Sequence, residues 1–177
     1  GGLGSASFVL KNGYSVGALV VVNPTGSVTS SGGKYFWAAP FELDGEFGGL
    51  GADPSPYLFS SKQSPKEKAM MLRSAQISNT TIAIVATDAP LTKTQCHRLA
   101  VTAHDGMARA IIPSHTPLDG DLVFGVSTTK GEVDHAVFRD IGASAAICLS
   151  RAIVRGVYEA TPSQDDILPT YKKTNCI

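Results

Sequence analysis

The chain has 177 residues, of which 43% are hydrophobic and 17% charged, a composition typical of a globular domain with a core of its own. Fifteen basic and fifteen acidic residues give a net charge of zero. This balance argues against a nucleic-acid partner, because phosphate binding needs a basic surplus on one face. The longest apolar runs are much shorter than a bilayer span, so no membrane partner is expected either.

Three cysteines, Cys96, Cys148 and Cys176, are an odd number at wide spacing and fit neither a disulfide framework nor a zinc motif. We interpret them as reduced thiols and, because no signal peptide is visible, expect a cytoplasmic protein. The sequence starts without a methionine inside a glycine-rich stretch. We therefore interpret it as part of a longer protein whose upstream portion is missing.

The first half of the sequence predicts a β-hairpin followed by a long irregular segment. A short strand over 7–10 and a buried, β-branched strand over 14–22 flank an Asn-Gly turn at 12–13. Residues 25–65 are rich in Gly, Ser and Pro, with scattered aromatic residues, and so long a loop is unusual in a compact domain. We expect its aromatic side chains to pack on the domain or to cover a site. The pattern over 66–74 indicates a short helix.

The second half predicts alternating strands and helices. A strong strand over 80–87 precedes a helix with a capping box, in which Thr92 is the N-cap and Gln95 reaches back to it. A strand over 121–128 follows, and Asp140 is the predicted N-cap of a final helix. Both helices carry small residues on one face, which allow close approach to a sheet. We therefore expect an α+β layered sandwich.

The hydroxyl residue Thr80 stands at the start of a buried strand, directly after Asn79. A β-branched residue there is ordinary on grounds of strand propensity alone. Cleavage of the Asn79–Thr80 peptide bond would instead give Thr80 a free α-amine beside its hydroxyl. Such an amine has a pKa of about 7.7–8.0 and can accept the hydroxyl proton near neutral pH. Thr80 is thus either an ordinary strand residue or a nucleophile.

Asp119 and Asp121 are two residues apart and share a face if the segment is extended. Held close together, they would share protons and separate in pKa; the alternatives are a polar turn and a metal pair, for which no third ligand stands nearby in the sequence. Asn23 ends a buried strand and is either a strand terminator or an amide donor to an oxyanion. His97 and His104 lie about 10 Å apart along the predicted helix, too far for one metal ion, and we predict surface or half-buried histidines. No metal and no cofactor is expected.

Several ordered motifs resemble the self-processing β-aminopeptidase and L-aminopeptidase/D-esterase family. They are residues 79–91 with the helix that follows, residues 115–124 (His-Thr-Pro-Leu-Asp-Gly-Asp-Leu-Val-Phe), and the upstream stretches 1–7 and 16–23. A threonine after the cleaved asparagine, together with residues 41–51, resembles the nylon-oligomer hydrolases of that family. Those enzymes cut 6-aminohexanoate oligomers internally.

The resemblance implies an αββα sandwich similar to that of the N-terminal-nucleophile hydrolases. It also implies that Thr80 is the nucleophile both of self-cleavage and of amide hydrolysis. Asn79 would become the last residue of an α subunit. Residues 1–79 would then be the C-terminal part of the α subunit and residues 80–177 the β subunit, the two together forming one domain.

The resemblance further implies that Asp119 and Asp121 position the nucleophile and its amine, and that Asn23 binds the oxyanion. The family's active site also uses a Tyr, and in the nylon branch a Lys, from upstream sequence that this chain does not include. The implied partners are a small amide or oligoamide substrate, the two fragments of one precursor, and further copies in a tetramer of αβ units. An aminopeptidase on β-amino or small L/D-amino acid amides and an uncleaved, non-catalytic scaffold remain alternatives.

Overall fold

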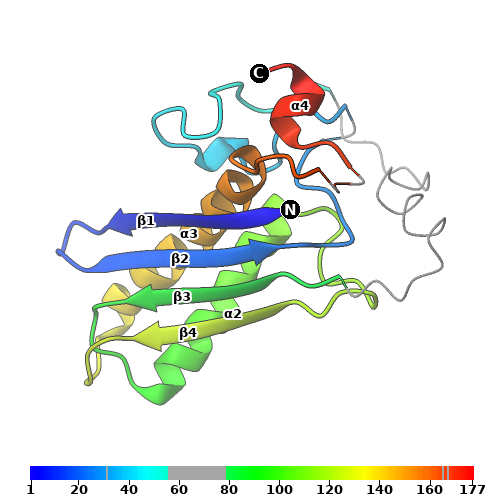
Figure 1. Ribbon diagram of the computed structural model, residues 1–177. Helices are drawn as coiled ribbons and strands as arrows, with labels where there is room; N and C mark the ends of the chain where they lie inside the picture. The colour runs from blue at the N-terminus through cyan, green and yellow to red at the C-terminus, as the bar shows by residue number, and fades with distance from the viewer. Residues whose placement is uncertain (31, 56–78, 165, 167) are drawn as a thin grey trace.

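The computed structural model of the protein describes residues 1–30, 32–55, 79–164, 166 and 168–177. Figure 1 shows one mixed sheet with two long helices behind it and a short helix near the chain ends. The elements in chain order are β1 (Gly2–Val9), β2 (Ser15–Val22), the 3-10 helix η1 (Ala39–Phe41), β3 (Ile82–Thr87), α2 (Lys93–Ala110), β4 (Leu122–Ser127), α3 (His135–Tyr158) and α4 (Tyr171–Asn175). The helix predicted over 66–74 lies outside the described residues.

The strands lie in the order β1-β2-β3-β4. β1 pairs with β2 and β2 with β3 in antiparallel fashion, whereas β3 and β4 are parallel. Near one edge of the sheet Ile82 is therefore opposite Val21 on one side and Leu122 on the other. This topology brings the end of β2 and the beginnings of β3 and β4 to one place, where the predicted site residues stand.

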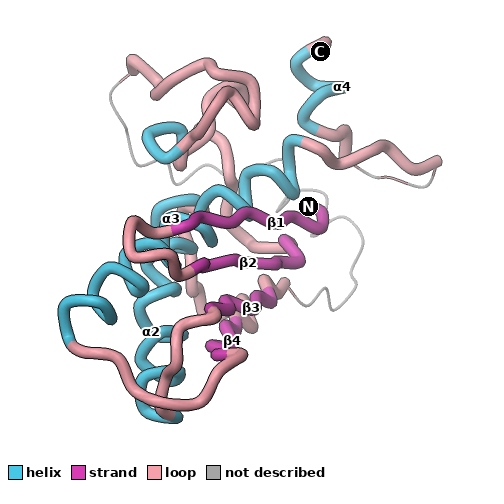
Figure 2. The backbone as a smooth tube through the Cα atoms, turned by 90° about the vertical axis from the view of Figure 1, so that its left-hand side faces the viewer, coloured by secondary structure: helices cyan, strands magenta, loops and turns pink. Residues whose placement is uncertain are grey.

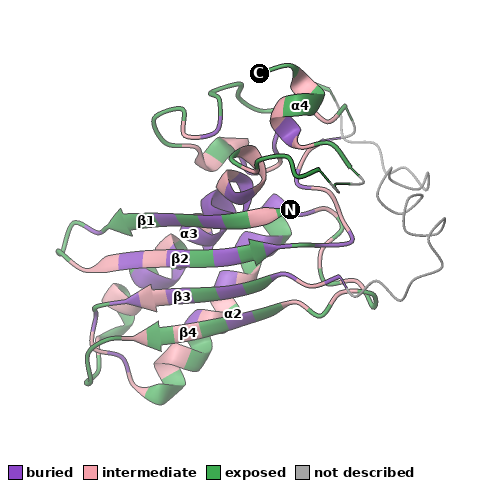
Figure 3. Ribbon diagram, viewed as in Figure 1, coloured by how far each residue is buried: buried purple, intermediate pink, exposed green. Residues whose placement is uncertain are grey.

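The two faces of the sheet differ, although both are apolar. Helices α2 and α3 cover one face (Figure 2), and the strands alternate between buried and exposed residues (Figure 3). On the other face nine large apolar side chains are exposed, namely Leu3, Val9, Leu19, Val21, Ile82, Ile84, Leu122, Phe124 and Val126. In a sandwich of two sheets, this is the kind of face on which the second sheet packs. The described residues thus supply one sheet and one helical layer.

The helix starts follow side-chain caps. The predicted capping box of α2 is confirmed: Thr92 Oγ1 accepts the Gln95 N–H at 3.1 Å, and Gln95 Oε1 accepts the Thr92 N–H at 3.0 Å. The predicted start of the last helix was wrong, because the carboxylate of Asp134 already caps α3 six residues earlier. Asp140 lies within the helix and pairs with Arg139 on the surface. None of the described helices is both long and apolar enough to cross a bilayer.

Small residues allow α3 to approach both α2 and the sheet closely, as the small-residue faces of the helices predicted. A Cβ atom at Gly106 on α2 would lie 2.4 Å from the carbonyl oxygen of Ala146 on α3. A Cβ atom at Gly4 on β1 would lie 1.9 Å from the carbonyl oxygen of Ala152. Because these neighbours are backbone atoms that cannot yield, the contacts of α3 with α2 and with β1 require glycine.

The described part of the irregular segment packs on the domain through its aromatic residues. Phe36 and Phe47 are buried, with ring centroids 5.6 Å apart. The ring of Tyr171, on α4, lies 4.4 Å from that of Phe36, and its hydroxyl donates to the carbonyl oxygen of Lys34 at 2.6 Å. The expectation that these aromatic residues pack on the domain is confirmed, and the C-terminal helix closes over them.

An ion-pair network fastens the same segment to α3. The Glu46 carboxylate accepts hydrogen bonds from Arg151 Nε at 2.5 Å and Nη2 at 3.0 Å, and from Arg155 Nη1 at 3.3 Å. Arg151 also donates to the carbonyl oxygen of Ser7 at 2.9 Å, and its side chain is only 7% exposed. Burial works to raise the pKa of Glu46, but the hydrogen bond and charge of Arg151 outweigh it and lower that pKa.

Candidate active site

Three segments far apart in the sequence meet where β2 ends and β3 and β4 begin. The N–H of Thr80 donates to the carbonyl oxygen of Asn23 at 2.9 Å. The N–H of Gly120 donates to the carbonyl oxygen of Asn79, also at 2.9 Å. The peptide bond between Asn79 and Thr80 is thus held on its nitrogen side by the end of β2 and on its oxygen side by the segment before β4.

The hydroxyl of Thr80 lies beside that peptide bond. Its Oγ1 donates to the Asn79 carbonyl oxygen at 2.6 Å. Thr80 is half-buried, whereas Asn79 and Thr81 are buried. Thr81 accepts the Leu122 N–H at 3.0 Å, so the backbone immediately after Thr80 is already fixed in the sheet. The Thr80 hydroxyl is therefore carried by backbone that is held rigidly just before β3 begins.

Asp119 ties its own loop to the segment that follows β2. Its Oδ1 accepts the Thr25 N–H at 2.8 Å, and its Oδ2 accepts the Thr116 N–H at 3.1 Å and the Thr116 hydroxyl at 2.5 Å. Burial works to raise the pKa of Asp119, but the hydrogen bonds from Thr116 and Thr25 outweigh it, so this pKa lies below its usual range. Asp119 is therefore a carboxylate at neutral pH.

Asp121 holds the backbone beside Thr80 and is itself held by a histidine. Its side chain is 2% exposed, and its Oδ1 accepts the Thr81 N–H at 2.9 Å. Its Oδ2 lies 3.0 Å from His115 Nδ1 and accepts the His115 N–H at 3.3 Å. The two aspartates thus use different partners and do not form the shared-proton pair that their spacing allowed.

The side chain of His115 also contacts α2, because its Nε2 lies 3.4 Å from Nδ1 of His104. Burial lowers the pKa of His104, and the neighbouring His115 lowers it further. The sequence indicated a half-buried His104 at most and did not predict its contact with His115, because one lies on a helix and the other in a loop eleven residues later. Among the described residues, no group of three His, Cys, Asp or Glu side chains is arranged to hold a metal ion.

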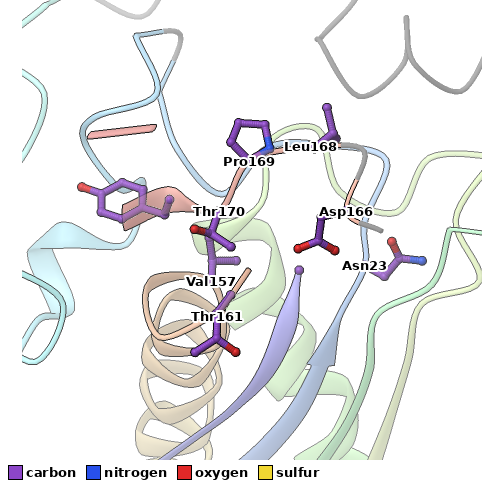
Figure 4. Close-up of a pocket in the computed structure, with 10 residues that line it drawn as sticks. Asn23, Val157, Thr161, Asp166, Leu168, Pro169 and Thr170 are labelled. Carbon is purple, nitrogen blue, oxygen red and sulfur yellow. The ribbon is translucent and has the colours of Figure 1, made fainter. Parts of the chain in front are cut away.

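Asn23 contacts the Thr80 backbone through its main-chain carbonyl. Asn23 also lines a cavity. The cavity has a volume of about 350 Å³ and is lined by the end of α3, by Asn23 and by the segment before α4. Figure 4 shows the carboxylate of Asp166 between Asn23 on one side and Thr170 on the other. Asn23 is thus the residue that the peptide contact and the cavity have in common.

Solved structures with the same architecture define the class of fold. A β-aminopeptidase of Burkholderia sp. matches with a TM-score of 0.52 and 24% identity over 89% of this chain and 41% of that chain. A protein of Pyrococcus horikoshii matches with a TM-score of 0.55 and 23% identity over 90% of this chain and 40% of that chain. An L-aminopeptidase D-Ala-esterase/amidase of Ochrobactrum anthropi matches with a TM-score of 0.50 and 19% identity over 88% of this chain and 39% of that chain. Its fold is a variant of the N-terminal-nucleophile hydrolase fold. The chain has this α+β fold.

The sequence comparisons identify the family. The model of peptidase family S58 matches residues 1–166, and the chain belongs to this family. An uncharacterized aminopeptidase of Mycobacterium bovis is 38% identical over 97% of this chain and 51% of its own length. A 6-aminohexanoate-oligomer endohydrolase of Kocuria sp. is 38% identical over 31% of this chain and 16% of its own. The chain spans about half the length of the Mycobacterium relative.

Proposed function

We propose that the protein containing this chain is a self-cleaving amide hydrolase that uses Thr80 as its nucleophile. The observation that carries the proposal is the hydroxyl of Thr80, hydrogen-bonded at 2.6 Å to the carbonyl group of the peptide bond that it would attack. Membership of peptidase family S58 and the 38% identity to an aminopeptidase over nearly the whole chain support it.

Self-cleavage begins with attack of Thr80 Oγ on the carbonyl carbon of Asn79. The Oγ–C bond forms and the peptide C–N bond breaks, while the hydroxyl proton passes to the departing nitrogen. The product is an ester between Asn79 and the Thr80 side chain, and water then hydrolyses this ester. Residues 1–79 and 80–177 become separate polypeptides, and Thr80 gains a free α-amine.

In the cleaved enzyme, that amine accepts the proton of the hydroxyl as Thr80 attacks a substrate amide. Asp121 fixes the backbone at Thr81, and Asp119 fixes the loop that carries Asp121, so both position the nucleophile. Asn23 holds the amine through its main-chain carbonyl and presents its side-chain amide to the oxyanion. Water releases the acyl group and regenerates the enzyme.

Two substrate classes have separate support. The near-complete match to an aminopeptidase favours release of N-terminal residues from β-amino or small L/D-amino acid amides. The shorter match to a 6-aminohexanoate-oligomer endohydrolase favours cleavage inside nylon-6 oligomers. The lengths of the products from a 6-aminohexanoate oligomer distinguish the two: successive loss of single units indicates an exopeptidase, and internal fragments indicate an endohydrolase. We also propose that αβ units assemble into a homo-oligomer, tetrameric in the family that the sequence resembles.

The test of the proposed function is the covalent state of the purified full-length protein. Denaturing gels and intact mass should show two fragments that meet at Asn79 and Thr80, and N-terminal sequencing of the second fragment should begin with Thr80. A single intact polypeptide with no threonine amine would instead support the uncleaved scaffold and refute the proposed nucleophile.

Replacing Asp121 with asparagine is expected to reduce amide turnover by about a hundredfold or more, because a misplaced nucleophile loses near-attack geometry. The amide keeps the shape of the side chain, but it can replace with an NH2 group the oxygen that accepts the His115 N–H. Asp119→Asn should also reduce amide turnover, because Asp119 fixes the loop that carries Asp121. Steady-state kinetics and thermal melting would separate lost positioning from lost folding.

Asp88→Asn is the matched control for both variants. Asp88 also accepts a backbone N–H, that of Ser15 at 2.8 Å, but it lies at the opposite end of β3. Turnover should remain within a few-fold of wild type in this control. Wild-type turnover in the Asp119 and Asp121 variants as well would make the two aspartates turn residues only.

A further inference from the structure

Two donors converge on the carbonyl oxygen of Asn79. One is the Thr80 hydroxyl at 2.6 Å, and the other is the backbone N–H of Gly120 at 2.9 Å. Asn79 is only 1% exposed, so bulk water has little access to this residue. On the nitrogen side, the Thr80 N–H is held by Asn23. Both ends of this peptide bond are therefore fixed before any reaction.

The contact with Gly120 continues the parallel pairing of β3 and β4. Asn79 and Asp119 form a parallel bridge just before the two strands begin, and the Gly120 N–H follows from that register. The other hydrogen bonds between β3 and β4 only join the two strands. Here its acceptor is the one carbonyl group whose carbon the neighbouring hydroxyl would attack.

We propose that the backbone N–H of Gly120 is the oxyanion donor for cleavage of the Asn79–Thr80 bond, an inference that rests on the proposed self-cleavage. When Thr80 Oγ adds to the Asn79 carbonyl carbon, the C=O electron pair moves onto the oxygen, which becomes negatively charged. A donor already at 2.9 Å lies within the 2.7–3.1 Å range that stabilises such an oxyanion without reorganisation. The negative charge disappears again when the C–N bond breaks and the ester carbonyl forms.

The absence of a side chain at residue 120 fits this role. A Cβ atom at Gly120 would lie 2.9 Å from Thr80 Oγ1, closer than a carbon and an oxygen normally approach. Glycine therefore brings its N–H to the Asn79 carbonyl oxygen while it leaves room for the nucleophile. Any other residue that supplied the same N–H would push the hydroxyl away from the carbonyl group.

The test replaces the Gly120 backbone N–H with an ester oxygen, by incorporating glycolic acid at residue 120 of the full-length precursor. An ester oxygen cannot donate, and no side chain changes. We expect self-cleavage to slow by about a hundredfold to a thousandfold, the usual effect of removing one oxyanion donor. The measured quantity is the fraction cleaved against time, from intact mass.

The matched control is the hydroxy-acid analogue of threonine at residue 128. It removes the Thr128 N–H, which donates to the carbonyl oxygen of Thr87 at 3.0 Å, at the other end of the same pair of strands. Its acceptor is not the cleaved carbonyl group, so cleavage should proceed at nearly the wild-type rate, and thermal melting should show a similar loss of stability in both esters. Equal rates in the two esters, whether both fast or both slow, would overturn the role of Gly120. An uncleaved wild type would overturn the proposed function itself.

Discussion

The full-length Thr80→Ala variant is expected to remain one uncut polypeptide and to have no measurable amide hydrolase activity. The methyl group cannot attack the Asn79 carbonyl group, and among the residues that the structure describes no other group beside this peptide bond supplies both a nucleophile and, after cleavage, an adjacent base. Loss of a covalent nucleophile typically reduces turnover by about a millionfold. Intact mass gives the cleavage result, and turnover of an amide substrate gives the catalytic one.

The neighbouring Thr81 offers an isosteric control. Thr81 is fully buried, and its backbone, not its hydroxyl, contacts Asp121 and Leu122. Thr81→Val keeps its shape and should still be cleaved, as should Thr80→Ser, which keeps the hydroxyl. Cleavage at Asn79 in the Thr80→Ala variant would show that the nucleophile is a different group.

Glu46→Gln is expected to lower the free energy of unfolding by about 3–5 kcal/mol, because it leaves the charge of Arg151 buried without its carboxylate. The side chains of Glu46 and Arg151 are 13% and 7% exposed, so water can compensate little of this loss. Urea denaturation measures the effect. The exposed pair of Arg139 and Asp140, 75% and 50% exposed, provides the control, and Asp140→Asn should cost less than about 1 kcal/mol. Similar losses in both variants would mean that burial does not strengthen the Glu46 pair.

The same pair predicts a dependence of stability on pH. The pKa of Glu46 is lowered in the folded protein, so its contribution is fully present above the pKa of the unfolded chain, near 4.5. The contribution is lost as the pH falls through the lower, folded pKa. The difference in unfolding free energy between wild type and Glu46→Gln should therefore be constant near neutral pH and should shrink in acid. A difference that does not change between neutral pH and pH 3 would contradict this linkage.

Local sequence signals predicted the parts of the fold that depend on neighbouring residues. The turn between β1 and β2 and the capping box at Thr92 are short-range features, and both were confirmed. The start of α3 was misplaced because Asp134 and Asp140 are equally good caps in sequence, and only the packed helix shows which one is used. The network around Glu46 joins residues more than a hundred positions apart, which no local pattern indicates.

The candidate site was predicted as a set of residues but not as a set of contacts. The sequence singled out Thr80, Asp119, Asp121 and Asn23, and the sheet topology brings all four to one edge. Their hydrogen bonds, however, run largely through the backbone, which carries no residue-type signal. For the same reason no sequence pattern indicated a role for the Gly120 N–H, since a glycine in a polar turn is ordinary.

The strand order determines how the products of a cut at Asn79 would behave. Strands β1 and β2 would belong to one product, and β3, β4, α2 and α3 to the other. Yet β2 and β3 are hydrogen-bonded neighbours from Val16 opposite Thr87 to Val21 opposite Ile82, and α3 packs against β1 and β2. The two polypeptides would therefore co-elute as one obligate heterodimer, would unfold in a single transition, and would separate only in denaturant. A protein divided this way is a natural split pair, in which neither piece has a complete hydrophobic core until it binds the other.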